Sequence, residues 1–182
     1  MPSTPPALSP VDVAALLDAT VRTFVAEVAA LPEPVLRWHP APGEWCIKEV
    51  LGHLIEAERR GFAGRIRTLL DHEDPALERW DPDAIAQERG DCERDVTPLL
   101  DELAAMREAS RRLVERLGEP DLARSGRHPV VGRLRVGDLL HEWVHHDRNH
   151  VRQALANVQA FVWPAMGNAQ RFSASSSPAA RG

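Results

Sequence analysis

Apolar side chains recur every three or four residues along four long stretches of the chain, which is the spacing of amphipathic α-helices. No window shows the alternation with flanking turn signals that is typical of strands. Cap residues followed by proline mark helix starts, and glycine or proline marks helix ends. The four predicted helices cover about residues 9–31, 46–71, 97–118 and 136–160. The pattern therefore predicts an all-α four-helix bundle.

Two long connections allow crossovers between helices that are not neighbours in the bundle. Residues 71–94 form a polar loop, with a short helix expected around Ala84, and a loop of this length in a compact domain is usually functional or a crossover. Residues 119–134 form the other connection and are interrupted by glycine and proline. We expect one domain over residues 1–172 and a disordered tail over residues 173–182.

The length, charge and cysteine content of the chain exclude several classes of protein. The 182 residues suit one domain with a full core. The net charge of −5 argues against binding to nucleic-acid backbones. The two cysteines form neither a disulfide framework nor a CxxC motif, and no apolar run is long enough to span a membrane. Because the N-terminus also lacks the features of a signal peptide, we expect a cytoplasmic protein that binds neither nucleic acid nor membranes.

Four of the eight histidines lie within ten residues of the last helix, as two pairs with i,i+4 spacing that suits a shared metal ion. His141 and His145 share a face with charged residues, so this pair is expected to be solvated. His146 and His150 continue an apolar stripe that begins at Leu139. Buried imidazoles need partners for their polar nitrogens, and one metal ion satisfies both rings. Periodicity therefore favours His146 and His150 as ligands.

Two other sequence patterns in the same helix are typical of metal sites. His141-Glu142-Trp143-Val144-His145 is an HExxH sequence, the pattern of zinc metalloproteases, but no glutamate follows Glu142 and the extended histidine form is absent. A di-iron bundle needs Glu-x-x-His on two helices, and Glu142-x-x-His145 has no second copy. Both alternatives lack ligands that their chemistry requires.

His53 in the second predicted helix is the candidate for a third ligand, because it interrupts an otherwise apolar face. Taken alone, it reads as a core histidine bonded to a backbone carbonyl. Together with His146 and His150 it would make a set of three neutral imidazoles, which suits Zn²⁺ or Ni²⁺. Three protein ligands leave one position open for water or substrate, as in catalytic sites.

Two stretches of the sequence resemble the DinB-like family of bacterial metal-binding four-helix bundles. The first is Trp45-Cys46-Ile47-Lys48-Glu49-Val50-Leu51-Gly52-His53-Leu54, which fits the family pattern W-S-x-x-E-x-x-x-H-L with cysteine in place of serine. The second is Val136-Gly137-Asp138-Leu139-Leu140 followed by His146-Asp147-x-x-His150. The resemblance covers most of the chain.

This resemblance implies a fold, a site and a class of reaction. It implies up-down-down-up topology, metal ligands at His53, His146 and His150, and a homodimer. Characterised relatives include transferases that use low-molecular-weight thiols such as bacillithiol or mycothiol, which makes a thiol transfer to a small-molecule substrate the first expectation. A metal-dependent hydrolase and a non-catalytic, stress-related metal-binding or interaction protein are the alternatives, so enzymatic activity stays open here.

Several polar residues near these motifs have two interpretations. Cys46 is expected to cap a helix rather than to react, and Glu56 and Glu58 are expected to be solvated helix charges rather than a base or a support for the ligands. Asp147 either orients a ligand histidine or pairs with a nearby arginine. The arginines of the third helix alternate with glutamates, which disfavours DNA binding. They are Arg107, Arg111, Arg112 and Arg116.

Overall fold

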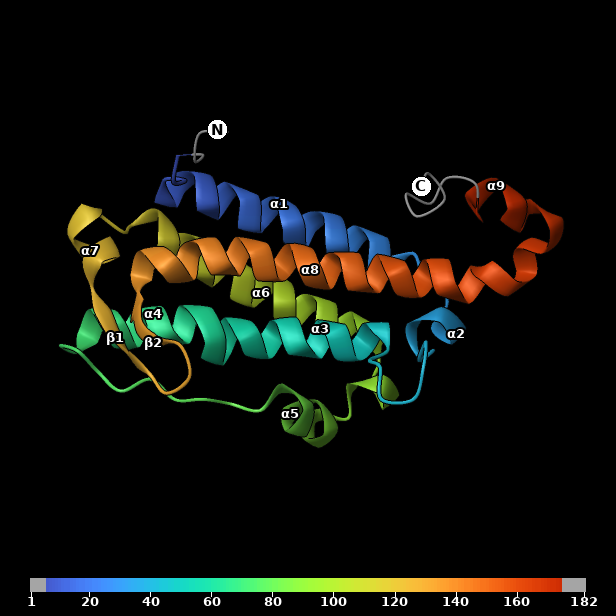
Figure 1. Ribbon diagram of the computed structural model, residues 1–182, viewed down its shortest axis with the longest axis horizontal. Coiled ribbons are helices and arrows are strands. Elements are labelled where there is room, and N and C mark those ends of the chain that lie inside the picture. The colour runs from blue at the N-terminus through green and yellow to red at the C-terminus, as the bar shows by residue number, and fades with distance from the viewer. Residues whose placement is uncertain (1–5, 175–182) are drawn as a thin grey trace.

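Four long helical rods lie side by side in the computed structural model, which describes residues 6–174 (Figure 1). The second rod is built from three consecutive segments, of which the middle one is π-helical. The rods are α1 (Pro10–Ala29), α3 (Ile47–Glu56) with the π-helix Ala57–Phe62 and α4 (Ala63–Asp71), α6 (Val96–Glu115), and α8 (Val136–Val162). The predicted all-α bundle is confirmed.

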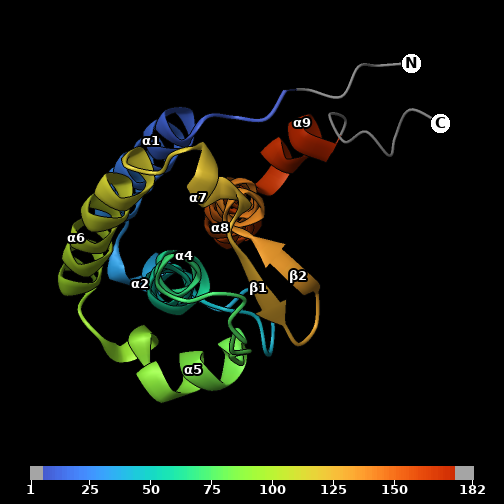
Figure 2. The ribbon, with the colours of Figure 1, turned by 90° about the vertical axis from the view of Figure 1, so that its left-hand side faces the viewer.

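The rods run up, down, down and up in chain order (Figure 1). Helix α1 packs most extensively on α6 and also on α8, while α3 packs on α6 and α8. Consecutive rods α1 and α3 are therefore diagonal in the bundle, and the end view in Figure 2 shows this square arrangement. The topology places α3 next to α8, the two helices that carry the candidate ligands.

Short elements fill the connections. Helix α5 lies outside the bundle, where the sequence predicted a short helix in the polar loop (Figure 2). The third rod ends at Glu115 rather than at Gly118, because Gly118 begins the next short helix. The short elements are α2 (Glu33–Leu36), α5 (Pro82–Arg89), the 3₁₀ helix Asp91–Glu93, α7 (Glu119–Ala123), the 3₁₀ helix Trp163–Ala169 and α9 (Gln170–Ala174).

A β-hairpin lies between α7 and α8, in a connection where no strand was predicted. Strands β1 (Ser125–His128) and β2 (Gly132–Arg135) are antiparallel, and Gly132 has a φ of 76°, which suits the turn. The loop before α5 joins this hairpin through Leu77, whose N–H donates to the Arg127 carbonyl over 2.8 Å. The strands are short and rich in arginine, so they carry no alternation that sequence analysis would detect.

The core consists of two apolar clusters at the two ends of the bundle. Along α8, one cluster uses residues 136–143 and the other uses Ala154 and its neighbours. Between them lies a layer of buried polar side chains. Its members are Thr20, His53, Glu58, Arg107, Ser110 and Asp147. A buried polar layer must satisfy its own hydrogen bonds, so it marks the part of the bundle where the sequence departs from simple packing.

The helix starts follow the predicted capping chemistry. The Ser9 hydroxyl oxygen accepts a hydrogen bond from the Asp12 N–H at the start of α1, and the Asp12 carboxylate accepts one from the Ser9 N–H. Cys46 stands at the start of α3, where its backbone N–H donates to Glu49 over 2.8 Å. Within residues 6–174, no helix is both long and apolar enough to cross a membrane. Most of the predicted tail, residues 175–182, lies outside the described residues, and residues 173–174 belong to α9.

Candidate metal centre

The imidazoles of His53, His146 and His150 meet between α3 and α8. Their ligand nitrogens all lie within 4.8 Å of one another. His53 Nε2 and His146 Nε2 are 2.9 Å apart, and the ring centroid of His150 lies 4.4 Å from that of His53 and 4.5 Å from that of His146. The helix spacing explains this, because residues 146 and 150 are one turn apart and face α3 together.

Two of the rings, His53 and His150, are in surroundings that favour a nitrogen with a free lone pair. Burial, followed by the neighbouring rings, lowers the pKa of His53 to about 3, so this imidazole is neutral. Burial also lowers the pKa of His150. Gln153 Oε1 lies 2.8 Å from His150 Nδ1, so Nδ1 carries the proton and Nε2 is free to bind an ion. The Nδ1 atoms of His53 and His146 are buried without a hydrogen-bond partner among the described residues.

Aromatic side chains surround the three rings. Trp45 lies with its ring centroid 4.8 Å from that of His53 and stacks on His150 at 6.2 Å. Trp80 stacks on His53 at 5.5 Å, and Phe62 meets His146 edge-on at 5.0 Å. This apolar collar reduces the access of water and holds the imidazole planes in place.

The HExxH histidines lie apart from this cluster. His141 is exposed, and its ring bonds Gly137 O through Nδ1 and the Leu8 N–H through Nε2. His145 is exposed as well. Neither histidine belongs to a group of ligand atoms close enough to hold an ion among residues 6–174. The structure therefore does not assemble a protease-type site from this motif.

A buried group of charges lies behind His146. Arg107 of α6 pairs with Glu58 of the π-helix, and its Nη1 lies 2.7 Å from Asp147 Oδ2 of α8. Ser110 donates a hydrogen bond to Glu58. Asp147 Oδ1 is 3.6 Å from His146 Nδ1, so the carboxylate faces both the arginine and the ligand ring. The interpretation that Asp147 pairs with a nearby arginine is therefore confirmed, whereas its role in orienting a ligand histidine stays a prediction.

Burial and Arg107 act in opposite directions on the pKa values of the two carboxyl groups, Asp147 and Glu58, and the balance differs between them. Burial favours the neutral form of Asp147, but Arg107 outweighs it and holds the pKa of Asp147 below its ordinary value. At Glu58 burial prevails over Arg107, and the pKa is raised. The expectation that Glu58 is a solvated helix charge is wrong, because the π-helix turns it into the bundle.

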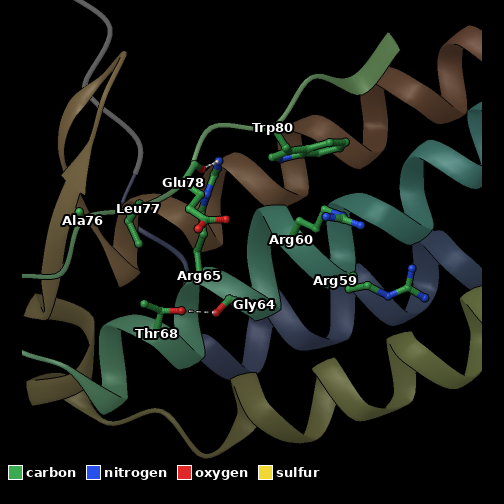
Figure 3. A pocket seen from close by; sticks show the side chains of 9 residues that line it. All are labelled: Arg59, Arg60, Gly64, Arg65, Thr68, Ala76, Leu77, Glu78 and Trp80. Atoms are coloured by element: carbon green, nitrogen blue, oxygen red, sulfur yellow. Dashed lines mark hydrogen bonds between the residues drawn. The ribbon is translucent and has the colours of Figure 1, made fainter. Parts of the chain in front are cut away.

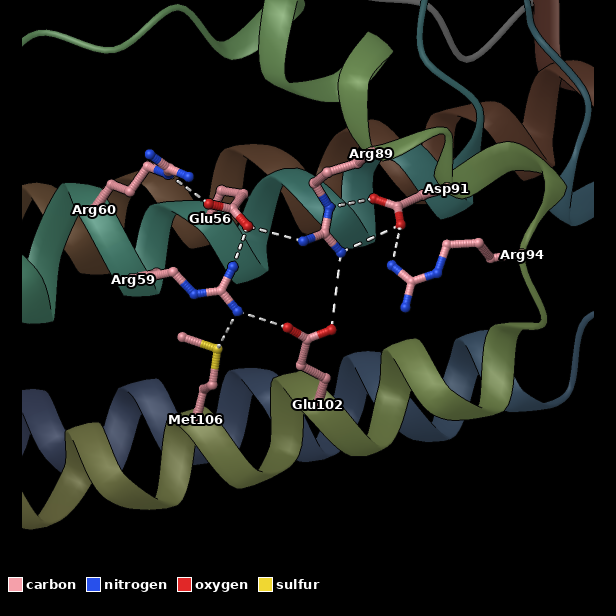
Figure 4. A network of polar contacts seen from close by, with 8 residues as sticks. All are labelled: Glu56, Arg59, Arg60, Arg89, Asp91, Arg94, Glu102 and Met106. Carbon is pink, nitrogen blue, oxygen red and sulfur yellow. Dashed lines mark hydrogen bonds and ion pairs between the residues drawn. The ribbon is translucent and has the colours of Figure 1, made fainter.

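Glu56 is also buried, contrary to the same expectation. Its carboxylate binds Arg59, Arg60 Nε at 2.6 Å and Arg89 Nη1 at 2.8 Å (Figure 4). Arg89 also binds Asp91, so the network ties the second rod to α5 and to the 3₁₀ helix that follows it. The arginines neutralise the carboxylate, which makes Glu56 a structural residue outside the histidine cluster.

A hollow of about 430 Å³ lies beside His146. Apolar side chains form much of its wall, and the β-hairpin contributes His128 and Leu134 to it. Glu142 lies one helical turn before His146 and lines the same hollow. Its wall also includes Phe62, Arg65, Trp80 and Leu139.

A second hollow of about 330 Å³ shares Arg65 and Trp80 with the first (Figure 3). Arg65 Nη2 donates to the Glu78 carbonyl over 3.0 Å and lies 3.2 Å from His128 Nε2. Its Nε is buried without a partner, and no carboxylate of the described residues pairs with this guanidinium. Burial lowers the pKa of Arg65, because the desolvated guanidinium lacks a counter-charge, and an anion bound between the hollows would supply one.

Comparison with known proteins agrees with this fold. Residues 16–154 match the family model described as the DinB superfamily. The chain belongs to the DinB superfamily. This assignment confirms the family that the two sequence motifs suggested and covers all three clustered histidines.

Among solved structures, the DinB-superfamily chain is similar to YfiT from Bacillus subtilis, which is described as a probable metal-dependent hydrolase with an unusual four-helix bundle topology. The TM-score is 0.78 at 18% sequence identity, and the similarity covers 88% of this chain and 94% of YfiT. No curated protein matches the chain in sequence. At this identity the likeness establishes the shared fold.

Sequence analysis missed several residues of this DinB-superfamily site. Trp45 stands in the family motif without an assigned role, and Trp80 has no signal in the sequence, yet both rings lie against His53. Arg65 had no signal, because its surroundings come from the hairpin and the polar loop. Arg107 was grouped with surface arginines, although it lies one turn after the buried Leu103 on the core stripe of α6. The spacing of Arg107 from Leu103 could therefore have identified this arginine as buried.

Proposed function

We propose that this protein is a divalent-metal-dependent transferase that joins a low-molecular-weight thiol to a small electrophilic substrate. The observation that carries the proposal is the meeting of three imidazoles from two helices beside a hollow that His146 lines. Three nitrogen ligands with a further position free are typical of catalytic zinc sites, and nickel suits the same donors.

His53, His146 and His150 fit a divalent ion and would hold it. Gln153 orients His150, and Asp147 faces His146, which are the supports that ligand histidines usually have. A bound ion would lower the pKa of a thiol or a water molecule that enters its free position. The aromatic collar excludes bulk water around the reacting groups, which strengthens electrostatic interactions there.

Two adjoining hollows suit a reaction with two substrates. The hollow beside His146 is largely apolar and would hold the electrophile, while the hollow in Figure 3 is lined by Arg59, Arg60 and Arg65. Cellular thiols of low molecular weight commonly carry carboxylates, and Arg65 has no carboxylate partner of its own in the described part of the chain. We therefore assign Arg65 to binding an anionic group of one substrate.

Glu142 supports a second candidate, a metal-dependent hydrolase. Its carboxylate lines the hollow that contains His146, where it can take a proton from an attacking water molecule. A thiol needs this base less, because a coordinated thiol loses its proton readily. YfiT, which shares the fold, is described as a probable metal-dependent hydrolase.

The metal site is tested by metal analysis of full-length protein purified without an affinity tag. His146→Ala should bind one equivalent of metal fewer than wild type, whereas His141→Ala should bind as much as wild type, since His141 is exposed and separate from the cluster. Equal metal content in the two variants would contradict the proposed ligands.

The reaction is tested by incubating the metal-loaded protein with an activated aromatic electrophile and a panel of cellular thiols. Thioether formation should require metal and should weaken with Arg65→Leu. Glu142→Gln should change this rate little but should abolish hydrolysis of ester or amide substrates if water is the nucleophile. Bound metal with neither reaction would identify a non-catalytic metal-binding protein.

A further inference from the structure

The chain has two cysteines, and the fold brings them together. Cys46 is fully buried at the start of α3, and Cys92 lies in the 3₁₀ helix Asp91–Glu93. His39, in the loop after α2, joins them, and the ligand atoms of these three residues lie within 4.8 Å of one another. They come from three different segments, so the cluster is a product of tertiary structure.

His39 is oriented by a carboxylate. Its Nε2 lies 2.9 Å from Glu49 Oε2, the same oxygen that accepts the Cys46 N–H over 2.8 Å. If Nε2 carries the proton, Nδ1 has a free lone pair. A histidine held by a carboxylate through one nitrogen and free at the other is the arrangement found at protein zinc sites.

The segments around the cluster are clamped without any ligand. The buried ammonium of Lys48 binds Glu33 Oε1 at 2.5 Å and the carbonyls of Cys92 and Arg94 at 3.3 and 2.7 Å. Arg37 pairs with Glu93 at 2.6 Å, and the Cys92 thiol lies 3.6 Å from the Arg37 carbonyl. The three ligand-bearing segments are therefore held in one arrangement, which reduces the entropy lost on binding an ion.

We propose that His39, Cys46 and Cys92 form a second metal site that is selective for zinc. Two thiolates and one imidazole are donors that zinc binds preferentially, and they are softer than the three imidazoles near His146. The fourth position would be filled by water or by Glu49, whose carboxylate already contacts the cluster.

The geometry requires only a small adjustment. Zinc bonds of about 2.3 Å to sulfur and about 2.0 Å to nitrogen place tetrahedral ligand atoms roughly 3.5 Å apart, so ligand atoms within 4.8 Å of one another need to approach by no more than about 1 Å. Burial, and then the Cys92 thiol, raise the pKa of Cys46, so the metal-free cysteine keeps its proton. Binding of the ion replaces the two thiol protons, which pass to solvent, and no electron is transferred.

A zinc ion at this position would brace the first metal centre. Cys46 follows Trp45, which contacts the rings of His53 and His150, and it precedes His53 by two helical turns. Fixing the start of α3 fixes the tryptophan and the helix that carries His53.

The test uses the reduced full-length protein without a tag. Wild type should bind two equivalents of zinc, Cys92→Ser and His39→Ala should bind one, and the exposed control His145→Ala should bind two. With cobalt(II) in place of zinc, wild type and His146→Ala should show sulfur-to-cobalt charge-transfer absorption, and Cys92→Ser should lack it. Because His146→Ala keeps the sulfur signal, this result is independent of the proposed transferase activity.

Two results would overturn the proposal. One is the absence of the charge-transfer band from cobalt-loaded wild type. The other is an intact mass lower by two hydrogen atoms with no free thiol in protein prepared without reductant but with zinc, which would show that the cysteines form a disulfide instead of binding metal.

Discussion

Arg107 Nη1 and Asp147 Oδ2 lie 2.7 Å apart in the middle of the bundle, where both side chains are 2% exposed. The pair joins α6 to α8 one residue away from His146, a proposed metal ligand. Arg107 also binds the fully buried Glu58, so one guanidinium compensates two carboxyl groups from two other rods. The arginine is therefore the central residue of the polar layer that separates the two apolar clusters.

Replacing Arg107 by alanine should lower the free energy of unfolding by about 3–5 kcal/mol, because it leaves buried carboxylates without a counter-charge. Urea denaturation measures this change. The matched control is Arg112→Ala on the same helix, whose side chain is 62% exposed and should change stability by less than about 0.5 kcal/mol. Similar losses in both variants would show that the buried pair contributes no special stability.

Gln153→Ala should weaken metal binding at the histidine cluster by about tenfold, because His150 loses the acceptor that fixes its proton on Nδ1. Competition with a zinc chelator gives the affinity. Gln159→Ala, an exposed glutamine on the same helix, should bind metal as wild type does. An unchanged affinity in Gln153→Ala would mean that His150 does not bind through Nε2.

Gly52→Ala should destabilise the protein although alanine favours helices. A Cβ at residue 52 would lie 1.7 Å from Asp91 Oδ2, and this buried carboxylate is held by Arg89 and Arg94. We expect a loss of about 1–3 kcal/mol in thermal or urea unfolding, the usual cost of overpacking. In an Asp91→Ala background the same substitution should be neutral or stabilising by up to about 1 kcal/mol. Equal effects in the two backgrounds would exclude the clash.

Glu56→Gln should destabilise the protein near neutral pH and have little effect in acid. Burial favours the neutral acid, but Arg60, Arg59 and Arg89 outweigh it and lower the pKa of Glu56. The carboxylate therefore contributes stability above its unfolded pKa of about 4.3, and this contribution is lost as the pH falls through the lower folded value. We expect a difference of about 2 kcal/mol at pH 7, as for hydrogen bonds to charged groups. Unfolding measured from pH 7 to about pH 3 tests the trend, and a constant difference would contradict it.

Periodicity and capping were sufficient to predict the four rods. The Ser9-Pro10 start and the apolar stripes depend on neighbours within a few residues, so the local sequence carries them. The position of His146 and His150 on the stripe of α8 was visible for the same reason, whereas His53 required the assumption that α3 packs beside α8.

The residues that the sequence did not reveal depend on contacts between distant segments. The π-helix changes the angular spacing of side chains along the second rod, and Glu58 lies buried there although its neighbours are charged. Arg65 acquires its environment from His128 of the hairpin and Trp80 of the polar loop. The spacing of residues within a single helix or strand does not predict such contacts between distant segments.

The placement of His53 on one rod and His150 on the last rod has a consequence for biosynthesis. Nearly a hundred residues separate the two, and helix α6 is made between them. A nascent chain cannot assemble the trio until residue 150 has left the ribosome, so ion capture follows translation of almost the whole polypeptide. Only a molecule that has been completely synthesised and has packed its helices correctly would then bind metal at the three histidines.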